Sequence, residues 1–452
     1  MFFAKYPAPA DDVRHVGALL AASPTFCHFR RSKAVCTKHK RVVWRIIHIK
    51  VLQYGDIIFA DSTAMATAHW SLAAAFVFNT SEFMPIGLLL DIGQSFALTE
   101  SQTGLMISVY AWAVMLLSMP LMVLSSRFEF KKLLLGVVGL FTLGQFLSTI
   151  APNFPFLIAA RLVVATSHAI FWSIAAIIAA RLVDPKHQPI ALSLIATGSS
   201  IAMIAGLPLG RMLGLAMGWR MTFASVGLIS AAILLYLYLV MPKLEATERF
   251  TFRQLPSLLK NPILVSLYIV IVFIATGYYT GYSYIEPFMA QIANMSPSLI
   301  TTSLTIFGLA GLAGSIIFSK VYDLNRFRFI AITLSGVMIS LLSLQLCASS
   351  FTAIIAICII WGMCSTAFNV AFQSELIRYT NPSASAVAMS IYSGLFNLGI
   401  GTGTAIGGQV TDKLSVANVG YTGGIITAIG VAVAISALFC AIRHRQTQPS
   451  NT

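Results

Sequence analysis

One carboxylate, Glu82, lies in a long apolar segment. The sequence FNTSEFMPIGLLLDI (78–92) places Asn79 and Glu82 one helical turn apart on one face, and Pro85 and Gly87 can loosen the helix beyond them. A carboxyl group in a low-dielectric site binds a proton more readily than in water. Exposed to water on alternate sides of a membrane, such a group loads and releases a proton during transport. Glu82 is a candidate for proton coupling, with a protonated or hydrogen-bonded structural acid as the alternative. Asn79 and Glu82 are also candidates for substrate binding.

A second polar group lies in RLVVATSHAIFWS (161–173), where Arg161, His168 and Trp172 follow one another along one apolar segment. A cation inside a membrane helix needs a partner, and Glu82 or a backbone carbonyl suits Arg161. A buried histidine is often only a hydrogen-bonded core residue, but its neighbours make a substrate or proton role an equal alternative. Arg161 and His168 are candidates for proton coupling, and His168 and Trp172 for substrate binding.

A third group is the tyrosine-rich segment TGYYTGYSYIEPF (276–288). Phenolic hydroxyls and aromatic rings suit sugars and other polyhydroxylated or amphipathic ligands. An aromatic belt at the membrane surface is the competing interpretation, and it fits Tyr284 and Phe288 better than Tyr278. The candidate ligand-binding residues of this segment are Tyr278, Tyr279 and Tyr282, and Glu286 shares the face of Tyr278 and Tyr282.

The amides Asn369, Gln373 and Asn397 also lie in apolar segments. Helix–helix hydrogen bonding is the favoured interpretation for them, and Asn397 is kept as a candidate substrate-binding residue. The six cysteines form no CxxC pair and no cluster with histidines, so no metal, disulfide or other cofactor is predicted. No HExxH, GxSxG, paired-aspartate or GxxxxGK[ST] pattern is present. Catalytic residues and nucleotide-driven pumping are therefore not expected.

The elements that must position these residues are long apolar helices. Hydrophobic residues make up 57 % of the chain and charged residues 10 %, with a mean hydropathy of +0.83, whereas soluble domains carry about 25 % charged residues. A membrane helix needs about 20 apolar residues, and the runs are too long for barrel strands. We predict an all-α membrane protein with twelve transmembrane helices, at approximately 68–90, 104–124, 133–151, 155–182, 189–212, 222–242, 263–287, 298–319, 329–348, 351–374, 384–409 and 417–441.

Basic residues concentrate in every second connection between these helices. With the N-terminus in the cytoplasm, the opposite side holds only Arg211, Arg220 and Lys413. This is the positive-inside pattern, and it predicts that both termini are cytoplasmic. The net charge of +14 therefore reflects membrane topology, and no nucleic-acid partner is expected.

Residues 1–67 differ from the rest of the chain. They contain the basic stretch HFRRSKAVCTKHKRVVWRIIHIK, show no signal peptide, and include Met65 just before the first predicted helix. A misassigned start with synthesis beginning at Met65 is favoured over a basic cytoplasmic extension. An amphipathic membrane-surface tail is a third alternative.

The predicted helices divide into two halves. The polar connection 243–262 separates a six-helix bundle at 68–242 from a second at 263–442, and a tail follows at 443–452. Weak similarity between 193–214 and 390–410, the fifth helix of each half, suggests a duplication, an architecture in which substrate binds between halves.

Glycines follow one face of both fifth helices. We interpret them as close-packed interfaces between the halves that let one half rock on the other, with a kink from Pro208. The glycines are Gly198, Gly206, Gly210 and Gly214 in the first half and Gly394, Gly401, Gly403 and Gly407 in the second. The candidates for the conformational change are Gly198, Gly206, Pro208 and Gly210.

Several strings carry a resemblance to a known family: FNTSEFMPIGLL, YAWAVMLLSMP, HAIFWS, GLPLGR with GWRMTF, YTGYSYIEPF and SGLFNLGIGTGTAIGGQV. Over residues 70–442 the chain resembles the major facilitator superfamily, in its proton-coupled drug and sugar efflux branch, and within it the bacterial sugar efflux transporters. GLPLG (206–210) resembles the antiporter motif of the fifth helix, and Arg161 takes the place of the fourth-helix arginine, although Ala165 replaces a glycine. The loop motif SSRFEFKK lacks the usual Asp and Gly, which weakens the expectation of an ordinary cytoplasmic gate.

The resemblance implies a monomer in the bacterial inner membrane that exports sugars or related small solutes in exchange for protons, with no catalytic activity. Its expected partners are the small-molecule substrate, protons and the lipid bilayer. A multidrug antiporter is the alternative function, and a membrane receptor or sensor on a transporter fold is an alternative of a different class.

Overall fold

The computed structural model describes residues 62–125, 128–183, 188–244, 258–380 and 384–439, and within these ranges every regular element is a helix. The all-α prediction is confirmed. Residues 1–61, most of the predicted linker and the tail lie outside the described residues. Because α3 already begins at Ser62, the last residues of the predicted extension belong to the first helix. Thr63–Thr452 form one compact unit, so the boundary between two halves stays a prediction.

The first half begins with a helix that changes type twice, because a helical Pro85 cannot donate a backbone hydrogen bond. The chain turns at residues 151–153, where the Asn153 side chain accepts from the backbone N–H of Phe156 at 2.9 Å and caps the following helix. The elements are α3 (Ser62–Phe83), the 3-10 helix η2 (Met84–Leu88), α4 (Leu89–Phe96), α5 (Glu100–Ser125), α6 (Phe130–Thr149), α7 (Phe154–Arg181), α8 (Gln188–Ile201), the π-helix η4 (Ala202–Gly206), α9 (Leu207–Met217) and α10 (Trp219–Val240).

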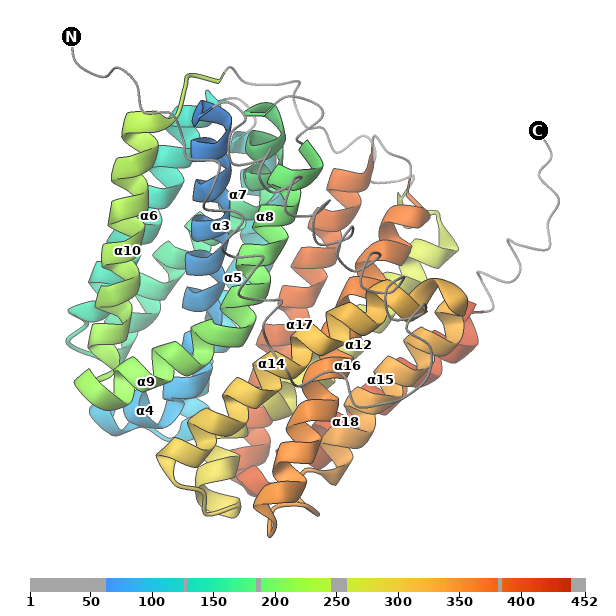
Figure 1. Cartoon of the computed structure of the whole chain (residues 1–452). Coiled ribbons are helices and arrows are strands. Elements are labelled where there is room, and N and C mark those ends of the chain that lie inside the picture. The colour runs from blue at the N-terminus through green and yellow to red at the C-terminus, as the bar shows by residue number, and fades with distance from the viewer. Residues whose placement is uncertain (1–61, 126–127, 184–187, 245–257, 381–383, 440–452) are drawn as a thin grey trace, which may run out of the picture. The chain divides into compact units, whose positions relative to one another are not determined.

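The second half repeats the use of capped helix starts. Asn261, Ser296, Asn325 and Ser350 each precede a helix and accept a backbone N–H of its first turn. The elements are α12 (Pro262–Tyr282), α13 (Ile285–Pro287), the π-helix η6 (Phe288–Ile292), α14 (Pro297–Val321), η7 (Tyr322–Leu324), α15 (Arg326–Ser343), α16 (Phe351–Arg378), α17 (Ser385–Lys413), η9 (Val416–Asn418), α18 (Val419–Val433) and the π-helix η10 (Ala434–Leu438) (Figure 1).

Eleven helical segments in the described ranges are long and apolar enough to cross a membrane, one fewer than predicted. The remaining predicted span, 384–409, corresponds to α17, whose glycines and polar residues lower its hydropathy. This helix has 29 residues, about 43 Å at 1.5 Å per residue, which exceeds the thickness of the hydrocarbon core. It packs against α5 and α12, so we assign it as the twelfth span, inside the helix bundle.

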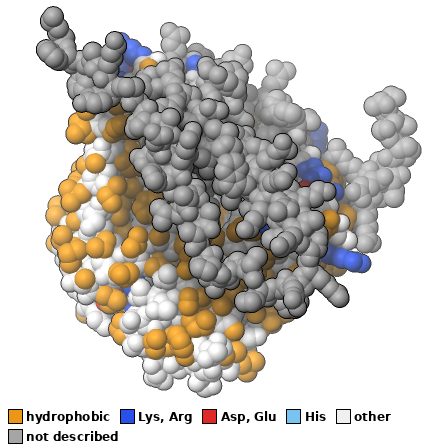
Figure 2. Space-filling view, viewed as in Figure 1, with side chains coloured by type: hydrophobic (Ala, Val, Ile, Leu, Met, Phe, Trp, Pro, Cys, Tyr) orange, Lys and Arg blue, Asp and Glu red, His pale blue; other side chains and the backbone are white. Residues whose placement is uncertain are grey.

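The buried apolar side chains form two clusters. One lies entirely within residues 70–241, and the other lies mainly within 258–438 but includes Ile86, Ile107 and Leu207 from the first half. Large apolar side chains also remain exposed, and Figure 2 shows them spread over the part of the visible face that described residues form. An apolar exterior around such a core is what lipid contact requires.

The glycines of the fifth helix pack within the first half, not between halves. A Cβ on Gly198 would collide with the carbonyl oxygen of Leu72, and one on Gly206 would lie 2.6 Å from Thr80 Oγ1. Gly210 and Gly214 likewise face Met84 and Leu88 of the first helix. The interpretation of these residues as an inter-half interface is therefore wrong, because the first helix occupies the space beside them.

In the second half, Gly403 and Gly407 pack on α12 of the same half in a corresponding way. Gly401 is different, since a Cβ there would lie 2.5 Å from Trp112 of α5. Gly394 is more loosely placed, with a Cβ position 3.9 Å from the carbonyl oxygen of Met115. Only part of this glycine face therefore meets the other half.

Replacing Gly198 with alanine tests this packing. The added methyl group meets the backbone of Leu72, which cannot move aside, and overpacking of this kind typically costs about 1–3 kcal/mol. We expect the thermal melting temperature in detergent to fall for Gly198→Ala. Gly136→Ala is the control, because nothing lies within 4 Å of a Cβ at Gly136; equal melting temperatures for the two variants would contradict this packing.

Candidate functional site

The break in the first helix exposes backbone groups that a continuous helix would use. Proline at position 85 has no N–H, so the carbonyl of Ser81 one turn earlier loses its helical donor. Arg161 fills this place: its Nη2 donates to the Ser81 carbonyl at 2.8 Å and its Nη1 to the Ser81 hydroxyl at 3.0 Å. Gln145 also donates to that hydroxyl, at 2.5 Å. A charged side chain thus completes the hydrogen bonding of a broken membrane helix.

Arg161 is almost fully buried, at 2 % exposure. Its guanidinium lies 4.5 Å from the ring centroid of Tyr110 and 5.6 Å from that of Phe223, which favours the charge through the negative faces of the rings. Of the two partners expected for Arg161, the structure therefore shows the backbone carbonyl. Arg161 and Glu82 form no ion pair in this arrangement of the described residues.

Glu82, His168 and Trp172 form a buried polar cluster. Glu82 Oε2 lies 3.6 Å from His168 Nε2, and Trp172 Nε1 donates to the same nitrogen at 2.8 Å. Because an indole N–H can only donate, Nε2 is the acceptor and the neutral imidazole carries its proton on Nδ1, which has no hydrogen-bond partner among the described residues. A proton arriving at Nε2 would have to displace the indole, so His168 cannot bond Trp172 and donate to Glu82 through the same atom.

Asn79 lies one turn before Glu82 and links the first helix to α8. Its Nδ2 donates to the carbonyl of Ala75 and to the hydroxyl of Ser199, each at 3.0 Å. This amide therefore holds two helices together in the present arrangement, and it is not among the residues that line the cavity described below.

At the far side of the same break, a buried ion pair joins the two halves. Arg211 of α9 donates to a carboxylate oxygen of Glu286, and its Nη1 also donates to the carbonyl of Gly87 at 2.7 Å. The second oxygen of Glu286 accepts from the backbone N–H groups of Leu89 at 3.0 Å and Leu90 at 3.4 Å. These N–H groups lie at the start of α4, where a carboxylate acts as a cap.

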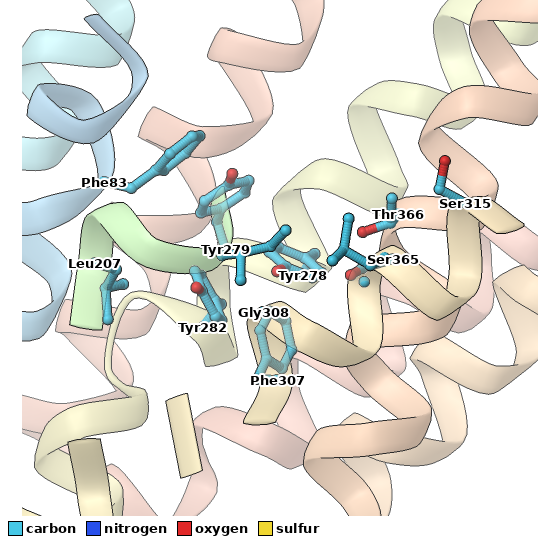
Figure 3. Close-up of a pocket in the computed structure, with 13 residues that line it drawn as sticks. Phe83, Leu207, Tyr278, Tyr279, Tyr282, Phe307, Gly308, Ser315, Ser365 and Thr366 are labelled. Atoms are coloured by element: carbon cyan, nitrogen blue, oxygen red, sulfur yellow. The ribbon is translucent and has the colours of Figure 1, made fainter. Parts of the chain in front are cut away.

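An aromatic cavity lies beside these groups. Its empty volume is about 600 Å³, which includes space that opens at the surface of the molecule. Figure 3 shows Tyr278, Tyr279 and Tyr282 between Phe83 and Leu207 on one side and Ser365 and Thr366 on the other. The lining residues are Phe83, Ile204, Leu207, Tyr278, Tyr279, Tyr282, Phe307, Gly308, Gly311, Leu312, Ser315, Ser365 and Thr366.

The cavity wall is built by packed rings. Tyr282 stacks on Phe307 with centroids 5.1 Å apart, and Trp361 lies edge-on to Tyr278 at 5.5 Å and to Tyr282 at 5.8 Å. Such contacts fix ring positions and leave a preformed surface for a ligand.

Comparisons with known proteins agree with this architecture. The family model described as Major Facilitator Superfamily matches residues 71–374 and, in a second match, 267–452. The chain belongs to the major facilitator superfamily. A "Probable sugar efflux transporter" of Mannheimia succiniciproducens is 41 % identical over 79 % of this chain and 90 % of that protein. Proteins of the same description from Pasteurella multocida and Helicobacter pylori are each 40 % identical, over 80 % and 83 % of this chain and 89 % and 95 % of theirs.

Solved structures of transporters have the same fold at low identity. The inward-facing, occupied structure of a bacterial homologue of the human lysosomal transporter Spinster has a TM-score of 0.69 and 16 % identity, and covers 87 % of this chain and 100 % of its own. The human organic anion transporter MFSD10 has a TM-score of 0.61 and 14 % identity, over 82 % of this chain and 98 % of its own. The prediction of a multi-pass membrane protein with the major facilitator fold is confirmed.

In this superfamily member, only some of the predicted site residues line the cavity. The three tyrosines line the cavity, whereas Asn79, Glu82, His168 and Trp172 line none of it. Asn397 lies on α17, where its Nδ2 donates to the Ser393 carbonyl at 3.0 Å and its Oδ1 has no partner among the described residues. Gln373 donates to Asn369 one turn earlier. The roles proposed for these residues stay predictions.

Two expectations from the sequence are wrong. Arg211, counted as a basic residue of a connection, is 2 % exposed inside α9 and pairs with Glu286. Tyr284 and Phe288 do not form a surface belt, since both are fully buried and Tyr284 donates to the carbonyl of Thr404 at 3.1 Å. An arginine directly following GLPLG inside an apolar run is the signal in the sequence that points to the ion pair.

Removing the charge of Glu286 tests the ion pair. In Glu286→Gln the buried Arg211 loses its charged partner and keeps only neutral acceptors such as the Gly87 carbonyl, and breaking a buried pair from one side costs about 3–5 kcal/mol. We expect a clear fall in melting temperature. Lys132→Gln is the control, because Lys132 and Glu129 form an exposed pair at 3.4 Å that contributes little; a loss no larger than in the control would refute the role of Glu286.

Proposed function

We propose that this protein exports sugars or related small solutes in exchange for protons by alternating access. The observation that carries the proposal is the cavity with its three tyrosines and its serine and threonine hydroxyls, a lining suited to polyhydroxylated ligands. The printed description of the relatives, which are about 40 % identical, supports sugar as the substrate class. The proposed setting is the bacterial inner membrane, with a monomer whose termini are both cytoplasmic.

The bonds between the two halves at one end of the bundle support alternating access. Arg211 and Glu286 connect α9 to α13, and Gln291 Nε2 donates to Glu100 Oε1 at 2.6 Å. With the basic connections in the cytoplasm, these contacts lie at the outer ends of their spans. The present arrangement is then closed toward the outside, and transport requires this end to open.

Proton coupling is assigned to the cluster around Glu82. Its side chain is 9 % exposed, and its Oε2 lies 3.6 Å from His168 Nε2. In the proposed cycle Glu82 takes up a proton on the outer side and releases it inside, while His168 changes its bond to Trp172. Arg161 holds the helix break and keeps a positive charge near the cluster.

Proton flux through liposomes tests the carrier. Protein is reconstituted with a pH-sensitive dye, and a panel of sugars and antibiotics is added under an imposed proton gradient. We expect substrate-dependent proton movement in the wild type and its loss in Glu82→Gln, which cannot carry the proton. Glu129→Gln, which alters an acid in the exposed pair with Lys132, is expected to couple normally.

Two results would count against the mechanism. Substrate movement without proton flux in the wild type would exclude proton-coupled antiport as the mechanism. Normal coupling in Glu82→Gln would show that Glu82 is a structural acid and not the proton carrier.

Multidrug antiport is the second candidate, and the apolar residues Phe83, Leu207 and Phe307 in the cavity wall favour it. The same panel decides between the two candidates. Sugars that drive proton release favour sugar export, and antibiotics that do so when sugars do not favour drug export.

Cross-linking across the closed end tests alternating access. In a cysteine-free background, cysteines at positions 100 and 291 replace the hydrogen-bonded Glu100 and Gln291, and a short cleavable bis-thiol reagent joins them. We expect transport to stop when they are joined and to return after cleavage. A cross-link between positions 129 and 132 on one helix end is the control and should leave transport intact; unimpaired transport with 100 and 291 joined would contradict opening at this end.

A further inference from the structure

Two hydroxyl groups at one end of the cavity have no partner in the described part of the chain. Ser315 and Thr366 line the cavity, yet neither side chain forms a hydrogen bond there. Many other helical hydroxyls here donate to a carbonyl one turn earlier, as Thr305 does to Thr301 at 2.8 Å. A hydroxyl that does not bond its own helix, and that faces a cavity, is available to a ligand.

Close packing of α14 and α16 puts Thr366 in this position. A Cβ on Gly311 would lie 2.6 Å from Thr366 Oγ1, and one on Gly314 would collide with the carbonyl oxygen of Met363. At position 311 only glycine therefore leaves space for the Thr366 hydroxyl beside α14. The neighbouring Ser365 differs from Thr366, because it donates to the Gly362 carbonyl at 3.0 Å and is hydrogen-bonded to Tyr278.

The opposite end of the cavity is apolar. Phe83, Ile204 and Leu207 close it from the first half, and Figure 3 shows Phe83 and Leu207 on the side away from Ser315 and Thr366. None of the described lining residues carries a charge. A charged group entering this space would lose water without gaining a partner, whereas an uncharged ligand has no charge to desolvate.

We propose that the cavity orients an uncharged amphipathic glycoside, with its sugar hydroxyls at Ser315 and Thr366 and its apolar aglycone against Phe83 and Leu207. The inference rests on the proposed function and deepens it, since it names the residues that select the sugar part of the ligand. Thr366 is the specificity-determining residue, because it lines the cavity and its hydroxyl, 2.6 Å from where a Cβ on Gly311 would lie, forms no hydrogen bond within the described residues.

Binding to protein in nanodiscs tests the orientation without requiring transport. The probes are phenyl β-galactoside, methyl β-galactoside and phenol, measured by calorimetry for wild type and Thr366→Val. Valine keeps the shape of threonine and removes the hydroxyl. We expect the affinity for both galactosides to fall about 5- to 10-fold, the loss of one neutral hydrogen bond, with no change for phenol. Phenyl β-galactoside should bind wild type more tightly than methyl β-galactoside because its ring fills the apolar end.

Three further variants make the result specific. Thr366→Ser retains the hydroxyl and should keep most of the affinity, and Thr305→Val should change nothing because that hydroxyl bonds its own helix. Gly311→Ala should act like Thr366→Val by displacing the hydroxyl, and an unchanged melting temperature for Thr366→Val shows that folding is intact.

The outcomes separate the two levels of the proposal. Galactosides that bind wild type and Thr366→Val equally would overturn the orientation and leave sugar export standing. A wild type that binds phenol but neither galactoside would overturn both the orientation and the sugar substrate.

Discussion

The break of the first helix at Pro85 is the constraint on which much of the structure depends. In lipid, backbone N–H and C=O groups must find partners within the protein. This break removes the helical hydrogen-bond partners of several such groups within a membrane span. Arg161 takes the Ser81 carbonyl, while Arg211 takes that of Gly87. Glu286 accepts the first N–H groups of α4. The buried charges are thus explained by the backbone they complete.

These bonds tie three other helices to the first one, but with different consequences. Arg161 belongs to α7 of the same half, so its bond can persist through a movement of one half against the other. Glu286 belongs to the second half, and its carboxylate must leave α4 and Arg211 if this end opens. Two charged groups and two backbone N–H groups then need water or new partners. The closed end is therefore held by groups that only a hydrated, open state can release.

Much of the fold can be predicted from hydropathy because each span is marked by its length and composition. The turn at Asn153 and the irregularity after Glu82 follow from local asparagine and proline chemistry. The partners of Arg211 and of the fifth-helix glycines cannot be predicted in this way, because sequence spacing gives the face of a helix but not which neighbour lies against it. The same holds for Thr366: many helical threonines here bond their own backbone, and only the structure shows that this one, packed beside Gly311, forms no hydrogen bond within the described residues.

The proton cluster and the cavity are separate sites joined by consecutive residues of one helix. Glu82 faces His168, while Phe83, the last residue of α3, lines the cavity. A helix that ends here through a change to the 3-10 form can rotate or shift its end at lower cost than a continuous helix can. Any such shift that follows a change of charge at Glu82 also moves Phe83 against the ligand. Coupling between proton and substrate then needs no direct contact between them, since the two adjacent side chains move as one piece of backbone.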